Sequence, residues 1–265
     1  MSCPDCETGK LLPSEPTGVM NPDGSYLAPQ PEGGLENRVI VLLSDAFGLP
    51  LKNSKILADN LSYRLSCDVW VPDLFDGKPP LKVGQLKLPD RAGVKQSTFD
   101  WIKFVFAVLP SLPSFIMNRP KVVDAHIASF ILKLKSERSY TKVGAVGYCF
   151  GGAAAVRLGS TDLIDCIVIC HPGRFNLTLV NSIRVPSSWA CAEDDESFSM
   201  TLRKEAEAIL FTMKKNGNAS EYEFIDYKGT AHGFAARPNL AIPEVKQGYE
   251  KSFEQTVSWF QKFLS

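Results

Sequence analysis

The sequence predicts one α/β domain with a mostly parallel central sheet and helices on both faces. Its first strong strand-like run, 38–44, is apolar along most of its length rather than alternating, as expected of a strand buried on both faces. Further strand-like runs follow it along the chain. These runs alternate with segments of helical periodicity, and neither an internal repeat nor an internal linker interrupts the order. At 265 residues and 45% hydrophobic composition, the chain can bury one substantial core.

The expected elements follow in chain order. Residues 1–37 are rich in Gly and Pro and predict a segment that wraps the surface, apart from a short β-prone run at 25–28, so the domain itself is expected over 38–265. The expected strands are 38–44, 67–71, 142–147, 164–170, 185–192 and 221–227. Helices are expected where apolar residues recur every three or four positions, at 53–65, 122–134, 201–215 and 245–264, and in the alanine-rich run 153–158.

The stretch 78–120 is the least regular, with several prolines around the apolar run 101–117. Two interpretations stay open for it: an insertion or lid over the edge of the sheet, or an ordinary amphipathic packing helix. A membrane span is not expected, because Lys103, Pro110 and Pro113 interrupt a run that is also too short.

Composition disfavours several classes of partner and compartment. The 29 basic and 29 acidic residues give zero formal net charge, so nucleic acid and anionic membranes are not expected partners. The first ten residues lack the apolar stretch of a secretory signal, and an odd count of seven cysteines, mostly in apolar runs, predicts reduced thiols and a cytoplasmic protein. Composition does not predict the oligomeric state.

The pair Cys3 and Cys6 is the remaining cysteine pattern. A C-x-x-C pair can be half of a zinc site or a redox pair, but no second pair has ligand spacing. No phosphate-cradling loop occurs either, so neither a metal nor an organic cofactor is expected.

The strongest motif is Gly147-x-Cys149-x-Gly151, which lies between an apolar strand and an alanine-rich helix. It is G-x-S-x-G with sulfur in place of oxygen, in the strand–turn–helix context of a nucleophile elbow. A cysteine after a strand is usually a packing residue, but this context favours a nucleophile. The N-terminus of the following helix would stabilise a thiolate.

A thiol nucleophile needs an imidazole base, and the imidazole needs a carboxylate to orient it. Such groups gather at the carboxyl edge of a parallel sheet. The residues expected there are Asp45, Asp73, Cys149, His171, Asp194, Asp195 and His232. Only His232 follows the acidic loop, in the order nucleophile, acid, histidine, so His171 is expected to line the pocket or to be structural. His126 lies inside a predicted helix, and spacing alone leaves Asp194 and Asp195 open as the acid.

Four short motifs occur in one order: Asp-Ala-Phe-Gly at 45–48, Val-Pro-Asp-Leu-Phe at 71–75, Gly-Tyr-Cys-Phe-Gly-Gly at 147–152 and His-Gly-Phe-x-x-Arg at 232–237. In these the sequence resembles the dienelactone hydrolase family of α/β-hydrolases, and its C-x-x-C start resembles fungal members.

The resemblance implies a triad in which Cys149 attacks, His232 moves the proton and Asp195, rather than Asp194, orients the imidazole. It implies an oxyanion hole made by the backbone N–H groups of Phe150 and Ala46. Asp45 stands where the family carries a thiol-activating Glu. Tyr148, His171 and Arg237 are expected around the thiol and the pocket.

The function predicted is hydrolysis of a lactone or small ester through an acyl-thioester on Cys149, similar to carboxymethylenebutenolidase. Dienelactone itself is not implied as the substrate, because Gly77 stands where bacterial members that use it carry an arginine. Two alternatives stay open. One is a carboxylesterase or thioesterase with an apolar acyl pocket, and the other is a catalytically silent shell that acts as a binding or redox protein.

Overall fold

The computed structural model describes residues 11–82, 88–94, 97–138, 140–218 and 220–265. The Cys3/Cys6 pair lies outside the described residues.

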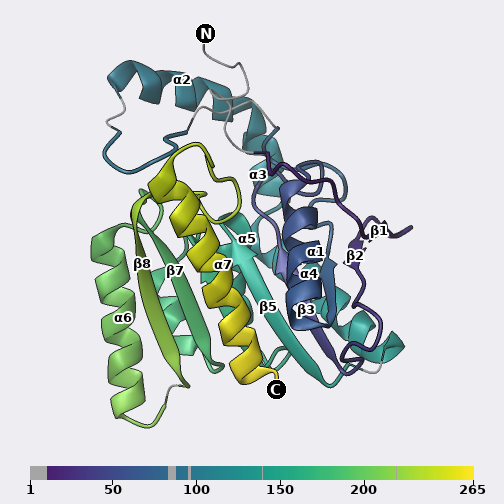
Figure 1. Cartoon of the computed structure of the whole chain (residues 1–265). Helices are drawn as coiled ribbons and strands as arrows, with labels where there is room; N and C mark the ends of the chain where they lie inside the picture. Colours follow the sequence, from purple (N-terminus) through teal and green to yellow (C-terminus); the bar gives the residue numbers. More distant parts are fainter. Residues whose placement is uncertain (1–10, 83–87, 95–96, 139, 219) are drawn as a thin grey trace.

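The described residues form one eight-stranded sheet in the order β1-β2-β4-β3-β5-β6-β7-β8 (Figure 1). The strands are β1 (Val19–Met20), β2 (Tyr26–Ala28), β3 (Arg38–Leu43), β4 (Asp68–Val71), β5 (Lys142–Tyr148), β6 (Cys166–Cys170), β7 (Ser187–Asp194) and β8 (Tyr222–Ala231). Strands β3 to β8 pair in parallel, and β1 and β2 join one edge antiparallel. The predicted α/β class with a mostly parallel sheet is confirmed.

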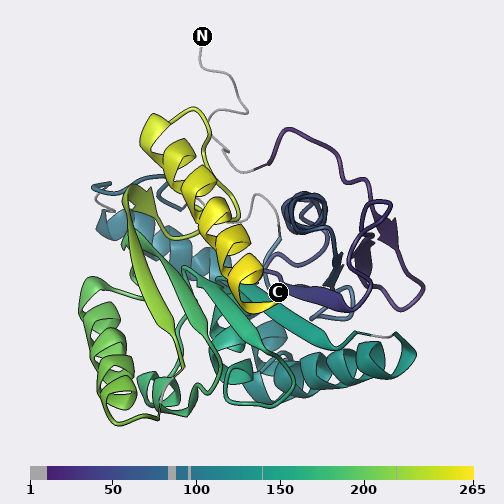
Figure 2. The ribbon, with the colours of Figure 1, turned by 60° about the horizontal axis from the view of Figure 1, so that its bottom comes forward.

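Helices cover both faces of the sheet (Figure 2). They are α1 (Asn53–Leu65), α2 (Thr98–Val108), α3 (Leu112–Met117), α4 (Pro120–Glu137), α5 (Phe150–Leu158), α6 (Met200–Lys215) and α7 (Pro243–Phe263), with short 3-10 turns η2 (Leu109–Ser111) and η3 (Leu177–Ser182). Helices α1 and α7 pack on one face, and α4, α5 and α6 on the other. Successive residues of β3 alternate between these two cores, which is why its sequence is apolar throughout.

The N-terminal segment contributes to the edge of the sheet. Tyr26 pairs with Val71 of β4 in antiparallel register, and its phenol donates to Asp59 Oδ1 at 2.7 Å on helix α1. The segment is therefore attached through backbone pairing as well as through surface contacts.

Strand β8 runs four residues beyond its predicted end at 227. After an irregularity in the pairing at Ala192 and Asp194, Asp194 pairs again with Ala231. A polar Gly-containing run such as 228–230 gives no strand signal by itself, and its pairing partner lies far away in the sequence. This extension places His232 directly beside the end of β7.

Two glycines make the turn after β5 possible. A Cβ at Gly147 would lie 2.1 Å from the Gly151 carbonyl oxygen, and one at Gly151 would lie 2.1 Å from the Leu43 carbonyl oxygen. Between them Cys149 adopts φ 52° and ψ −109°, a conformation that is costly for a residue with a side chain. Hydrogen bonds hold it there: Cys149 N–H donates to Cys170 O at 3.2 Å, and Gly173 N–H donates to Cys149 O at 2.7 Å.

We expect Gly147→Ala to lower the free energy of unfolding by about 3 kcal/mol or more, because its Cβ would collide with backbone that cannot rotate away. Gly217→Ala is the matched control, because a Cβ there would meet nothing within 4 Å and only its φ of +72° would be unfavourable. That cost is about 1 kcal/mol. Urea unfolding measures both. Equal losses for the two variants would contradict the steric account of the elbow.

Candidate active site

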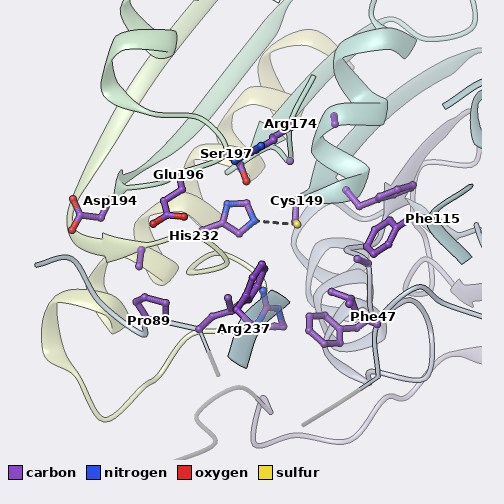
Figure 3. A pocket seen from close by; sticks show the side chains of 18 of the residues that line it. Phe47, Pro89, Phe115, Cys149, Arg174, Asp194, Glu196, Ser197, His232 and Arg237 are labelled. Atoms are coloured by element: carbon purple, nitrogen blue, oxygen red, sulfur yellow. Dashed lines mark hydrogen bonds between the residues drawn. The ribbon is translucent and has the colours of Figure 1, made fainter. Parts of the chain in front are cut away.

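Cys149, His232 and Asp195 lie in one hydrogen-bonded row at the carboxyl edge of the sheet (Figure 3 shows Cys149 and His232). Cys149 occupies the turn between β5 and α5, and His232 follows β8 directly. His232 Nε2 lies 3.0 Å from Cys149 Sγ, and His232 Nδ1 lies 2.8 Å from Asp195 Oδ2. The two ring nitrogens therefore face a thiol and a carboxylate, which fixes the plane of the ring.

The structure places Asp195, and not Asp194, at the imidazole. Asp195 is 7% exposed, and its second oxygen, Oδ1, accepts from the N–H groups of Ser197 and Phe198 at 2.8 and 3.1 Å. The side chain of Asp194 points elsewhere and accepts from Gly93 N–H at 2.6 Å, while its backbone carbonyl accepts from His232 N–H at 3.1 Å. Adjacent residues at the end of a strand point in opposite directions, so only one of the two can reach the ring.

The surroundings favour an imidazolium at His232. Burial opposes its charge, but the Cys149 sulfur as a thiolate and the Asp195 carboxylate outweigh that effect and raise the pKa of His232 to about 10.

His171 lies behind His232 and outside the row. It is fully buried, and its ring centroid is 5.1 Å from that of His232 and 5.5 Å from that of Phe234. Burial, together with the nearby cations of His232 and Arg237, holds the pKa of His171 well below its usual range. A neutral ring here packs against His232 without competing for its proton. Tyr148 is also buried, and its ring centroid lies 6.1 Å from that of His171. It is not among the residues that line the cavity.

Asp45 pairs with Arg237. Asp45 Oδ2 accepts from Arg237 Nε at 2.8 Å, and both side chains are almost fully buried. Its other oxygen accepts from Phe47 N–H at 3.1 Å, and the guanidinium lies over the Phe47 ring. Among the described residues no hydrogen bond joins Asp45 to Cys149, and a thiol-activating role for Asp45 stays a prediction.

Two backbone N–H groups are available for an oxyanion. Phe150 begins α5 and Ala46 follows β3, and both line the cavity in front of Cys149. Within the described chain neither N–H has a recorded acceptor, whereas the next amide of α5, Gly151 N–H, donates to Ser44 O at 3.0 Å.

Cys149 opens into a cavity of about 500 Å³. Its walls are mainly apolar and combine the ends of the parallel strands with residues of the 78–120 segment. That segment contributes Leu81, Leu88, Pro89, Phe104, Phe115 and Pro120. The two phenylalanines come from α2 and α3, which places this part of the segment over the site. The described residues hold no group of three or more His, Cys, Asp or Glu side chains that could bind a metal.

The chain matches the model of the dienelactone hydrolase family over residues 25–264. The chain belongs to this family. It is 27% identical to a hydrolase named pyvD from Aspergillus violaceofuscus over 262 residues, which cover 98% of this chain and 96% of that one. It is also 22% identical to the human carboxymethylenebutenolidase homolog, over 86% of this chain and 83% of that one.

The crystal structure of a dienelactone hydrolase from Anabaena variabilis covers 94% of this chain and 98% of its own, with a TM-score of 0.58 and 11% identity. At that identity the likeness concerns the fold alone. The predicted α/β-hydrolase fold is confirmed by these neighbours and by the sheet.

Among the residues that line the cavity, sequence reasoning did not identify Arg174. Arg157 is paired with Asp124 at 2.7 Å and Arg237 with Asp45 at 2.8 Å. Arg174 is exposed at the cavity, and no carboxylate of the described residues lies within ion-pair distance of it. The available signal was its position three residues after His171, at the same edge of the sheet.

The thiolate explanation of the His232 pKa predicts an effect of Cys149→Ala. In the wild type the His232 ring should titrate near pH 10, well above the ordinary value of about 6.5. Loss of the thiolate removes the largest favourable charge, while burial still opposes protonation, so the pKa should fall.

Carbon-13 NMR of the ring Cε1 resonances measures this change, since the chain has only three histidines. His171 should stay neutral in both proteins. A wild-type His232 that titrates near 6.5, unchanged by the substitution, would contradict the ion pair.

Proposed function

We propose that this member of a hydrolase family cleaves carboxylic esters or lactones with Cys149 as the nucleophile, His232 as the acid–base group and Asp195 as its orienting partner. The observation that carries the proposal is the row Sγ–Nε2–Nδ1–Oδ2, with separations of 3.0 and 2.8 Å, opening into a cavity. This is the arrangement that nucleophilic acyl transfer requires.

In the acylation step the Cys149 thiolate attacks the carbonyl carbon and forms a C–S bond. The carbonyl oxygen takes the negative charge and accepts from the N–H groups of Phe150 and Ala46. Collapse of this intermediate breaks the ester C–O bond, and His232 donates its proton to the departing oxygen. An open ester loses an alcohol at this point. In a lactone the departing hydroxyl stays attached to the acyl group.

Acylation also prepares His232 for the second step. Once the sulfur is bound in a thioester, the thiolate that raises the pKa of His232 is gone. The neutral imidazole, held by Asp195, can then take a proton from water as the water attacks the thioester carbonyl. The C–S bond breaks, the acid leaves, and the thiolate–imidazolium pair forms again.

A second candidate within this chemistry is a carboxylesterase or thioesterase for substrates with an apolar acyl chain. The cavity wall favours it, because Phe104 and Phe115 face the same space as Cys149. Each buried methylene contributes about 0.8 kcal/mol, so an acyl chain along this wall would raise kcat/KM several-fold per carbon. The silent-shell alternative is less favoured, because the hydrogen-bonded row of Cys149, His232 and Asp195 beside a cavity supports a catalytic role.

The decisive experiment compares wild type, Cys149→Ala and Cys67→Ala on p-nitrophenyl acetate, p-nitrophenyl hexanoate and a dienelactone. We expect Cys149→Ala to lower kcat by roughly a thousandfold or more. Cys67→Ala is the control, because that thiol is buried in the core and is absent from the cavity lining. The ratio among the three substrates then separates a lactonase from an apolar-chain esterase.

Two results would overturn the proposal. Activity that survives Cys149→Ala would show that Cys149 is not the nucleophile. A wild type that hydrolyses none of the three substrates and reacts with iodoacetamide no faster at Cys149 than free cysteine does would favour the silent shell.

A further inference from the structure

Helices α2 and α3 carry an apolar stripe that faces away from the protein. Its residues recur every three or four positions and are each 47 to 68% exposed: Phe99, Ile102, Phe106, Leu109, Leu112 and Ile116. We call these six residues the α2–α3 face. Figure 1 shows α2 lying across the top of the molecule and leading into α3. Large exposed apolar patches of this kind mark interaction surfaces.

Burial in the core of the protein does not explain the apolar composition of this segment. The segment Thr98–Met117 is apolar and long enough to cross a membrane by length and composition, yet only 6% of its most apolar window is buried in the protein. A core helix with this composition would be mostly buried. The segment is also divided into α2, η2 and α3, with Pro110 and Pro113 at the starts of the last two. A divided segment that roofs the cavity suits a membrane surface better than a transmembrane path.

The charge of the surrounding segment differs from that of the whole chain. Of the 29 basic and 29 acidic residues, residues 78–120 hold seven basic and two acidic ones, so the rest of the chain carries five more acids than bases. Both acidic residues of the segment already accept hydrogen bonds within the protein. Asp90 accepts from Asn239, and Asp100 caps the start of α2.

Three of the bases lie next to the face and are exposed. Lys103 is on α2, Lys78 contacts α3 through its carbonyl, and Arg119 follows the end of α3. The apolar face is therefore bordered by cations.

We propose that the α2–α3 face docks on an anionic lipid surface. Apolar side chains that enter the boundary of the bilayer, bordered by cations at the level of the headgroups, form the usual pattern of a peripheral membrane contact. A second copy of the chain is the less favoured occupant, because two such positively charged segments would repel each other. The expectation of no membrane partner rested on the charge of the whole chain, which does not describe this surface.

The position of the face also suggests a source of substrate, a point that rests on the function proposed above. The same helices present Phe104 and Phe115 to the cavity, so docking would hold the roof of the active site against the lipid. Esters that partition into the bilayer would then reach Cys149 directly.

Vesicle flotation tests the docking without any substrate. The full chain is mixed with vesicles of phosphatidylcholine alone, or of equimolar phosphatidylcholine and phosphatidylserine, at low and high salt. We expect binding to the anionic vesicles to be about tenfold stronger and to weaken with salt. Phe106→Asp and Lys103→Glu should each lower it by about tenfold. Phe211→Asp is the matched control, since Phe211 is 63% exposed on α6 and Phe106 is 68% exposed on α2.

Several outcomes would overturn the proposal. These are absence of binding to anionic vesicles, equal binding to both vesicle types at all salt concentrations, and a Phe106→Asp variant that binds like wild type. A wild-type dimer that Phe106→Asp converts to a monomer, without vesicle binding, would assign the face to self-association. Because Cys149→Ala should bind vesicles like wild type, failure of docking and failure of the hydrolytic proposal are measured separately.

Discussion

The contact between Cys149 Sγ and His232 Nε2 joins two segments 83 residues apart, and most of the architecture around it serves to hold them at 3.0 Å. The contact with the sulfur and the hydrogen bond to Asp195 both raise the pKa of His232 and so favour a protonated imidazole. The same contact makes the pKa of the imidazole depend on the charge of the sulfur. While the sulfur is charged the ring holds its proton, and once the sulfur is acylated the ring can release it. One contact can therefore support both halves of an acyl transfer.

Each partner in the contact is positioned by backbone rather than by side-chain packing alone. Cys149 is fixed in an unfavourable conformation by hydrogen bonds with Cys170 of β6 and with Gly173 beyond it. Glycines that leave no room for side chains make the turn possible. His232 is fixed because β8 resumes its pairing with β7 at Ala231, the residue directly before His232. The sheet thus determines the distance between sulfur and nitrogen, and the strain at Cys149 is offset by the pairing of the strands around it.

Much of this could be predicted because the signals are local. Helix 53–65 was expected with the bounds that α1 has, since its apolar spacing is encoded within the segment. The elbow was visible for the same reason. The end of β8, the pairing of Asp45 with Arg237 across 192 residues and the cation at Arg174 depend on which distant segments meet, and no short pattern reports that. The apolar run at 101–117 had the composition of a buried helix. Only the fold shows that its outer side is exposed.

The cavity and the α2–α3 face share one segment of the chain. Two helices supply phenylalanines inward to the reacting thiol and apolar side chains outward to solvent, so substrate access and surface contact are coupled through one segment. Such coupling would let an interface, rather than free solution, present the ester.

The covalent thioester is the most direct test of the central claim. The His232→Gln variant should take up an acyl group from an activated ester and release it slowly, because no base remains to activate water. Rapid quenching followed by intact-protein and peptide mass spectrometry should find the mass of one acyl group on the peptide that contains Cys149, and none after prior alkylation of that thiol. An acyl group on a different residue, or hydrolysis in the wild type without any acylated protein under conditions where His232→Gln also accumulates none, would contradict the account.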